Sequence, residues 1–176
     1  MKKVIVKVKL ANHDRFKRKM DEIGMEFSPI YYTHDRVYVP RGYKRGMNLP
    51  RLVMRTEVRA VDKPAKYSLI LKRHIEDSDV DIVEDTPIKD YADMANIITQ
   101  LGFKMQKEVA RRRQECSLGD GVMMYIDNIE GINGYFGKIE VDMNEDDKVS
   151  VLQDDARNTF SVLGEKNFIE NAYFED

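Results

Sequence analysis

The sequence is poor in cysteine, which bears on where the protein works. Cys116 is the only cysteine among 176 residues, so the chain cannot form an internal disulfide. Because disulfide-stabilised domains belong to oxidising compartments, we expect a cytoplasmic protein. The first residues, MKKVIVKVKL, lack the apolar core of a signal peptide. No apolar run approaches the ~20 residues that a membrane span requires, so we expect no membrane partner.

The chain also lacks an excess of charge of either sign. It has 29 Lys and Arg against 31 Asp and Glu, a net charge of -2. A dedicated nucleic-acid-binding domain is normally basic, so we expect no nucleic-acid partner. A hydrophobic fraction of 42% is ordinary for a folded chain. The length predicts one domain over residues 1–176.

Common catalytic and nucleotide-binding motifs are missing as well. There is no P-loop and no G-x-G-x-x-G, so phosphate capture by a helix N-terminus is not indicated. The three histidines, His13, His34 and His74, show no spacing typical of metal ligands. Cys116 has no evident base beside it, which favours a packed thiol over a nucleophile.

What the sequence does contain is strict alternation. Over residues 3–10, Lys3, Lys7 and Lys9 fall on one face of a strand, and valines fall on the other. Similar patterns predict strands at 26–40, 51–61, 66–75, 80–85, 104–117, 122–129 and 135–143. Apolar residues at helical spacing predict helices at 12–23, 91–101 and 149–163, each followed by glycine. Strands that arrive in hairpin-like runs indicate an antiparallel sheet of an α+β fold.

The polar faces of these strands are rich in Lys and Arg. Each face alone is explained by the solvent side of a half-buried strand. If the sheet curls around these faces, however, the charges meet in one channel and repel unless an anion or nearby carboxylates neutralise them. A polyphosphate suits such a channel, because Arg forks and Lys point charges both bind phosphate oxygens. The carboxylates could hold Mg²⁺ or Mn²⁺ that bridges to the phosphates.

These strands resemble, in order and over essentially the whole chain, the motifs of the CYTH group of triphosphate tunnel enzymes. That family includes class IV adenylyl cyclases and thiamine triphosphatases. Its E-x-E-x-K strand corresponds to residues 3–7, its L-R-x-R strand to 52–55 and its L-T-x-K strand to 69–72. Its V-x-[KR]-x-R-x-x-Y, D-x-V-x-G-L-G and E-I-E motifs are similar to residues 109–116, 127–133 and 138–140.

The resemblance implies an antiparallel eight-stranded β-barrel, or tunnel, with helices packed outside. It implies a phosphate-binding set of Lys7, Lys9, Arg55, Lys72, Arg111 and Arg113. It also implies Mg²⁺ or Mn²⁺ as cofactor, held by carboxylates from the set Glu140, Asp127, Glu57 and Glu84. The chain departs from the family where glutamates are expected: Lys3, Ile5 and Lys138 stand there. Since divalent cations need several oxygen ligands, we expect weak metal binding.

We therefore expect a small-molecule triphosphate or nucleotide as ligand. The resemblance favours a metal-dependent phosphohydrolase acting on an organic or inorganic triphosphate. A class IV adenylyl cyclase is one alternative, although we identify no base-and-ribose pocket. A non-catalytic nucleotide or polyphosphate sensor is another, which the missing glutamates favour. A homodimer is left open. Arg111 and Arg113 lie about 7 Å apart along one strand face, which suits two arginines gripping successive phosphates.

Overall fold

The alternating sequence folds into an antiparallel sheet. The structure, a computed structural model, describes residues 2–44, 47–75 and 80–169. Within these residues the elements are β1 (Lys2–Lys9), α1 (His13–Glu22), β2 (Tyr31–Pro40), β3 (Arg51–Val58), β4 (Lys66–His74), β5 (Val80–Pro87), α2 (Tyr91–Gln100), β6 (Phe103–Gly119), β7 (Val122–Ile129), β8 (Phe136–Met143), α3 (Val149–Val162) and β9 (Phe168–Ile169). The expected order is confirmed; β9 is an addition, and β2 begins five residues later than expected.

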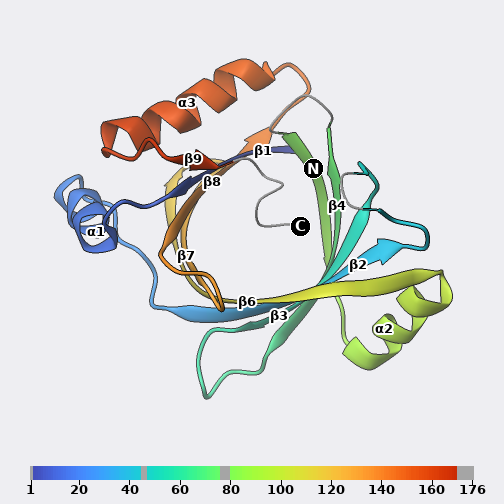
Figure 1. Cartoon of the computed structure of the whole chain (residues 1–176). Helices are drawn as coiled ribbons and strands as arrows, with labels where there is room; N and C mark the ends of the chain where they lie inside the picture. The colour runs from blue at the N-terminus through green and yellow to red at the C-terminus, as the bar shows by residue number, and fades with distance from the viewer. Residues whose placement is uncertain (1, 45–46, 76–79, 170–176) are drawn as a thin grey trace.

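The sheet closes on itself. Neighbouring strands follow the order β5-β4-β3-β2-β6-β7-β8-β1, and β1 pairs back to β5 through Lys2–Val4. Each pairing is antiparallel, as the hairpin-like sequence runs predict. The short strand β9 pairs with the other half of β1, at Lys7 and Val8. Figure 1 shows the resulting ring end-on, with all three helices outside it. The expected eight-stranded tunnel is therefore confirmed.

The helices α1 and α3 cover one side of the ring. Val6 and Val8, on the apolar face of β1, pack with Phe16 of α1 and Phe160 of α3 in the largest buried cluster. Gly137 of β8 permits this close approach, because a Cβ at that position would lie 2.8 Å from Phe160. The apolar faces of the strands thus point outward under the helices, and the opposite, polar faces point inward.

The helix α2 covers a second part of the outer face, beside β6 (Figure 1). Ile98 of α2 packs on Tyr38 of β2 and Met54 of β3. Asp90 caps this helix by accepting from the Asp93 N–H at 2.9 Å. In the part of the chain that the structure describes, no helix is long and apolar enough to cross a membrane.

Candidate functional site

The inward faces of the strands line a cavity inside the ring. Eight of the described residues that line it are cationic, whereas two, Asp35 and Asp127, are acidic. The rest are apolar, among them Val37, Val53 and Ile70, which form a small buried cluster. The cationic lining residues are Lys7, Arg51, Arg55, Lys72, Lys107, Arg111, Arg113 and Lys138.

Arginine–carboxylate pairs occupy one side of this interior. Arg55 of β3 donates to both oxygens of Asp35 in β2, from Nε at 2.7 Å and from Nη2 at 2.8 Å. Arg111 of β6 donates to the same Asp35 at 2.6 Å. Arg113 of β6 donates to both oxygens of Asp127 in β7, at 2.6 and 2.7 Å. We call Asp35, Arg55, Arg111, Arg113 and Asp127 the arginine wall.

Charge complementarity keeps the carboxylates of the arginine wall ionised. Burial alone would raise the pKa of Asp35, but Arg55 and Arg111 outweigh it and hold the pKa well below its ordinary value. Burial would likewise raise the pKa of Asp127, and Arg113 reverses the direction. Both aspartates and Arg113 are buried, so these are ion pairs removed from water.

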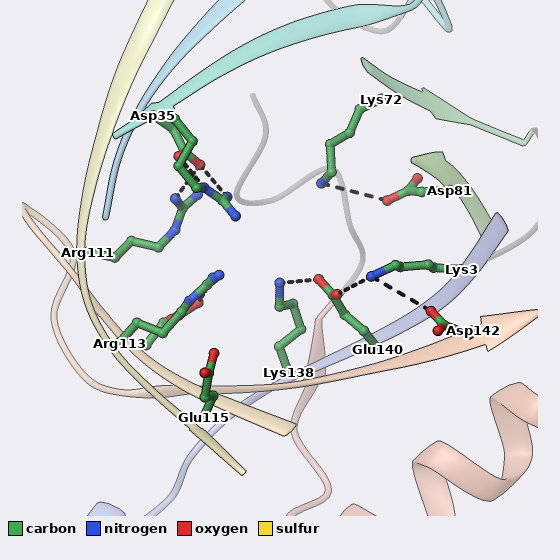
Figure 2. A network of polar contacts seen from close by, with 12 residues as sticks. Lys3, Asp35, Lys72, Asp81, Arg111, Arg113, Glu115, Lys138, Glu140 and Asp142 are labelled. Atoms are coloured by element: carbon green, nitrogen blue, oxygen red, sulfur yellow. Dashed lines mark hydrogen bonds and ion pairs between the residues drawn. The ribbon is translucent and has the colours of Figure 1, made fainter. Parts of the chain in front are cut away.

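Lysines face the arginine wall from the other side of the ring (Figure 2). Glu140 of β8 accepts from Lys138 at 2.5 Å and from Lys3 of β1 at 3.2 Å. The Lys72 ammonium in β4 lies 3.9 Å from Asp81 of β5. We call Lys3, Lys72, Asp81, Lys138 and Glu140 the lysine wall.

Burial and neighbouring charges shift the pKa values of two residues in the lysine wall, Glu140 and Lys138. Burial would raise the pKa of Glu140, but Lys138 and Lys3 hold it well below its ordinary value. Burial lowers the pKa of Lys138 from 10.5 to about 7, and the attraction of Glu140 offsets only part of this shift. Repulsion from Arg113 contributes to this lowering. The charge of Lys138 therefore responds to pH near neutrality.

A tyrosine lies between the two walls. The Tyr125 ring lies under Arg113, whose Cζ is 4.7 Å from the ring centroid, and under Lys138, whose Nζ is 4.5 Å away. Glu115 lies two residues after Arg113 on the same face of β6. It accepts from the Tyr31 hydroxyl at 2.6 Å and from Arg59 at 2.8 Å. Burial raises the pKa of Tyr31, so this hydroxyl remains a donor.

The structure brings most of the expected phosphate-binding residues together. Lys9 does not join them: it is the last residue of β1 and is exposed, and its Cε would lie 3.2 Å from a Cβ built on Gly134. The five that line the cavity are Lys7, Arg55, Lys72, Arg111 and Arg113.

Most of the carboxylates expected to bind a metal contact basic side chains in this structure. Asp127 and Glu140 accept from Arg and Lys, and Glu57 accepts from Arg59 at 2.5 Å. Glu84 is the register partner of Leu71, which lies between the inward positions Ile70 and Lys72 of β4. Glu84 therefore faces outward, and it is exposed. Among the described residues, no group of three or more His, Cys, Asp or Glu could hold a metal ion. This donor set does not fit Mg²⁺ or Mn²⁺, which need several carboxylate or water oxygens.

Lys3 and Lys138 entered the sequence analysis only as departures from the family motif, and two further members of the walls, Asp35 and Asp81, were missed. Asp35 was hidden because aromatic and β-branched residues dominate its strand, although Tyr31, Thr33, Asp35 and Val37 alternate and share the inward face. Asp81 is buried, yet it is the second residue of a strand, β5, whose sequence shows no clear alternation. Applying the same period-2 pattern to β2 would have found Asp35.

The closed ring of strands, its charged interior and the helices outside it define the class of protein: an antiparallel tunnel with a charged interior. No protein-family model matches the chain, and no curated protein matches its sequence significantly. Solved structures do match. A protein of Pyrococcus horikoshii is 22% identical with a TM-score of 0.83, over 98% of this chain and 96% of that one.

Two further structures carry functional descriptions. A presumed adenylate cyclase of Vibrio parahaemolyticus is 16% identical with a TM-score of 0.79, over 98% of this chain and 95% of that one. A presumed adenylyl cyclase of Hippeastrum, described as having a dominant triphosphatase activity, is 14% identical with a TM-score of 0.60, over 97% and 91%. The chain thus shares the fold of these structures, among them presumed adenylyl cyclases, as the resemblance seen in the sequence implies.

Proposed function

We propose that this protein binds the triphosphate chain of a small molecule inside its tunnel. The observation that carries the proposal is the excess of cations over carboxylates, eight against two, among the described lining residues. Several like charges facing one cavity repel each other, and a polyanion relieves that repulsion. A triphosphate supplies about three to four negative charges in a row, which offset at least half of this excess.

The two walls offer complementary phosphate contacts. On the arginine wall, Asp35 and Asp127 fix the guanidinium groups, so their orientation costs little entropy when a ligand binds. On the lysine wall, ammonium groups on long flexible stems adapt to the ligand. A chain of phosphates that lies between the walls can therefore contact both.

Turnover is the second candidate. The Hippeastrum neighbour, described as a triphosphatase, supports hydrolysis, and the Vibrio neighbour supports cyclisation. Metal-assisted phosphoryl chemistry relies on carboxylates that hold the metal. Here the inward carboxylates accept from Lys and Arg. We therefore rank binding without turnover, as in a sensor, above hydrolysis, and hydrolysis above cyclisation.

The test is a ligand panel read by thermal shift and calorimetry. Tripolyphosphate, ATP and thiamine triphosphate are compared with monophosphate, because an occupied site raises the melting temperature by mass action. We expect stabilisation that increases from monophosphate to triphosphate. Absence of binding by every triphosphate disproves the function. Release of phosphate or pyrophosphate in the same samples separates an enzyme from a sensor.

A matched pair of variants locates the site. Lys72 lines the cavity, whereas Arg73, the next residue of β4, is exposed on the other face. We expect Lys72→Met to weaken triphosphate binding by about tenfold, the loss of one charge-assisted contact. Arg73→Met should leave the affinity unchanged within about twofold. Equal effects at the two positions place the ligand outside the tunnel.

A further inference from the structure

Lys3 lies where carboxylates converge. Its ammonium donates to Glu140 at 3.2 Å and lies 3.8 Å from Asp142. Lys3 is also the register partner of Asp142 in β8 and of Asp81 in β5, because the ring closes at this residue. Figure 2 shows Lys3 reaching inward with Glu140 and Asp142 beside it. Two strands, β8 and β5, thus direct three carboxylate residues towards the neighbourhood of one ammonium group on β1.

The carboxylates around Lys3 depend on lysines for neutralisation. Glu140 places one oxygen against Lys138 and the other against Lys3. Asp81 is 2% exposed; its Oδ1 contacts His74 at 3.0 Å. Among the described residues its Oδ2 has no hydrogen-bond partner, and the Lys72 ammonium lies 3.9 Å away. Buried carboxylates of this kind repel one another unless cations lie between them.

A divalent ion and an ammonium group meet this need in different ways. Mg²⁺ requires about six oxygen ligands in octahedral geometry, and the protein supplies some of them as carboxylate oxygens directed at one point. An ammonium group donates to only three acceptors, and its positive charge is part of the protein, so no ion has to bind from solution. One oxygen of Glu140 accepts from Lys3, the other accepts from Lys138, and one oxygen of Asp142 lies 3.8 Å from the Lys3 ammonium, so a metal ion would have to displace these ammonium groups.

We propose that the Lys3 ammonium is a built-in cation of this tunnel, so that the protein binds a polyphosphate chain without a divalent metal. The inference rests on the proposed function, and it names the form of ligand the site takes: the metal-free polyanion. Lys3 offsets Glu140 and Asp142, which leaves the remaining inward cations to contact the phosphates.

The first test compares affinity with and without metal. Inorganic tripolyphosphate is titrated into the full chain by calorimetry, in EDTA and in Mg²⁺, at equal free tripolyphosphate. We expect the affinity in EDTA to match or exceed that in Mg²⁺. Binding that is tenfold or more weaker in EDTA overturns this inference and leaves the proposed function standing. Absence of binding in both buffers overturns the function, and this inference with it.

The second test asks whether Lys3 takes the metal's place. Lys3→Glu adds a carboxylate beside Glu140 and Asp142, and Mn²⁺ binding without any phosphate is followed by electron paramagnetic resonance. We expect at least a tenfold gain in Mn²⁺ affinity over the unmodified chain. Lys2→Glu is the matched control: Lys2 is exposed, pairs with Met143 and Ile82, and should gain nothing.

A folding defect does not remove the test. If circular dichroism shows Lys3→Glu to be unfolded, Lys3→Gln takes its place, since it removes the ammonium without adding a charge. We expect Lys3→Gln to bind Mn²⁺ more tightly than the unmodified chain, by about threefold or more. Unchanged Mn²⁺ binding in the folded variant, or a gain equal to that of Lys2→Glu, shows that Lys3 does not stand in a metal's place.

Discussion

The two walls of the tunnel both pair cations with carboxylates, but they use different cations and different geometry. On the arginine wall, Arg113 and Asp127 form a two-bond fork at 2.6 and 2.7 Å between buried side chains. On the lysine wall the contacts are single and range from 2.5 Å at Lys138–Glu140 to 3.9 Å at Lys72–Asp81. Figure 2 places the walls opposite each other.

This difference indicates a division of labour. A bidentate arginine pair is planar and directional, so it holds neighbouring strands in register and fixes the guanidinium for a ligand. A lysine is a point charge on a flexible stem, so it can leave a carboxylate for a phosphate at little cost. We therefore expect changes in the arginine wall to act chiefly on folding, and changes in the lysine wall to act chiefly on binding.

The largest effect should come from Arg113→Ala. It leaves Asp127 buried without its fork partner, which costs about 3–5 kcal/mol in other buried pairs. Repulsion among the lumenal cations, taken alone, predicts the opposite: removing one arginine would leave stability unchanged or raise it. The pairing with Asp127 reverses that expectation. Urea denaturation measures the free energy of unfolding directly.

Arg112→Ala is the control for Arg113→Ala. Arg112 lies on the outer face of the same strand, exposed, with its Cζ 5.9 Å from the Tyr32 ring centroid. We expect it to change the free energy of unfolding by about 0.5 kcal/mol or less. If the two variants are equally stable, the arginine wall does not contribute to folding stability, and the proposed division of labour between the walls is wrong.

On the lysine wall, Glu140→Gln should act chiefly on binding, and it should strengthen it. The amide no longer neutralises Lys3, so that ammonium group becomes available to an anion, and the bound anion takes over from Glu140 in keeping Lys138 protonated. We expect tripolyphosphate to bind about three- to tenfold more tightly, at most about 1.4 kcal/mol, and the free energy of unfolding to fall by about 1 kcal/mol. Calorimetry at fixed ionic strength measures the first, and urea denaturation the second.

The sign of the Glu140→Gln result separates two interpretations of the carboxylate. If Glu140 ligated a metal needed for binding, the amide would weaken binding instead of strengthening it. Glu115→Gln is a useful control, because Glu115 contacts Tyr31 and Arg59 and neither lysine of the wall. It should change affinity less than Glu140→Gln does.

Much of the fold could be predicted from the sequence because the strands alternate strictly. The strand expected at 122–129 has the observed bounds, Val122–Ile129, and the inward positions of β3, Arg51, Val53 and Arg55, follow from the alternation alone. Helices were found by apolar spacing and their glycine stops. The two-residue β9 is too short to show a period, and it owes its pairing to β1.

The partners within the walls could not be predicted in this way, because they depend on register between strands. Arg113 meets Asp127 only because β6 and β7 pair with a shift between Ser117 and Gly119. Lys3 approaches β5 only through ring closure, between strands far apart in sequence. Alternation gives the face of each residue, whereas register gives its partner. The sequence therefore indicated a charged tunnel and left its ion pairs open.

The smallest effect tests how the lysine wall responds to pH. Because burial lowers the pKa of Lys138 from 10.5 to about 7, the unfolded chain binds more protons than the folded one between pH 7 and 10.5. The free energy of unfolding should therefore rise with pH in that window, by about 1 kcal/mol or less between pH 7 and 8.

Burial raises the pKa of Cys116, which acts in the opposite direction near pH 9. Lys138→Met cancels that contribution in a difference measurement, because both chains contain Cys116. We expect the unmodified chain to gain stability relative to Lys138→Met as pH rises from 7 to 8, measured by urea denaturation in matched buffers. Parallel pH profiles for the two chains mean that Lys138 remains charged beside Glu140, and that the lysine wall is as fixed in its charges as the arginine wall.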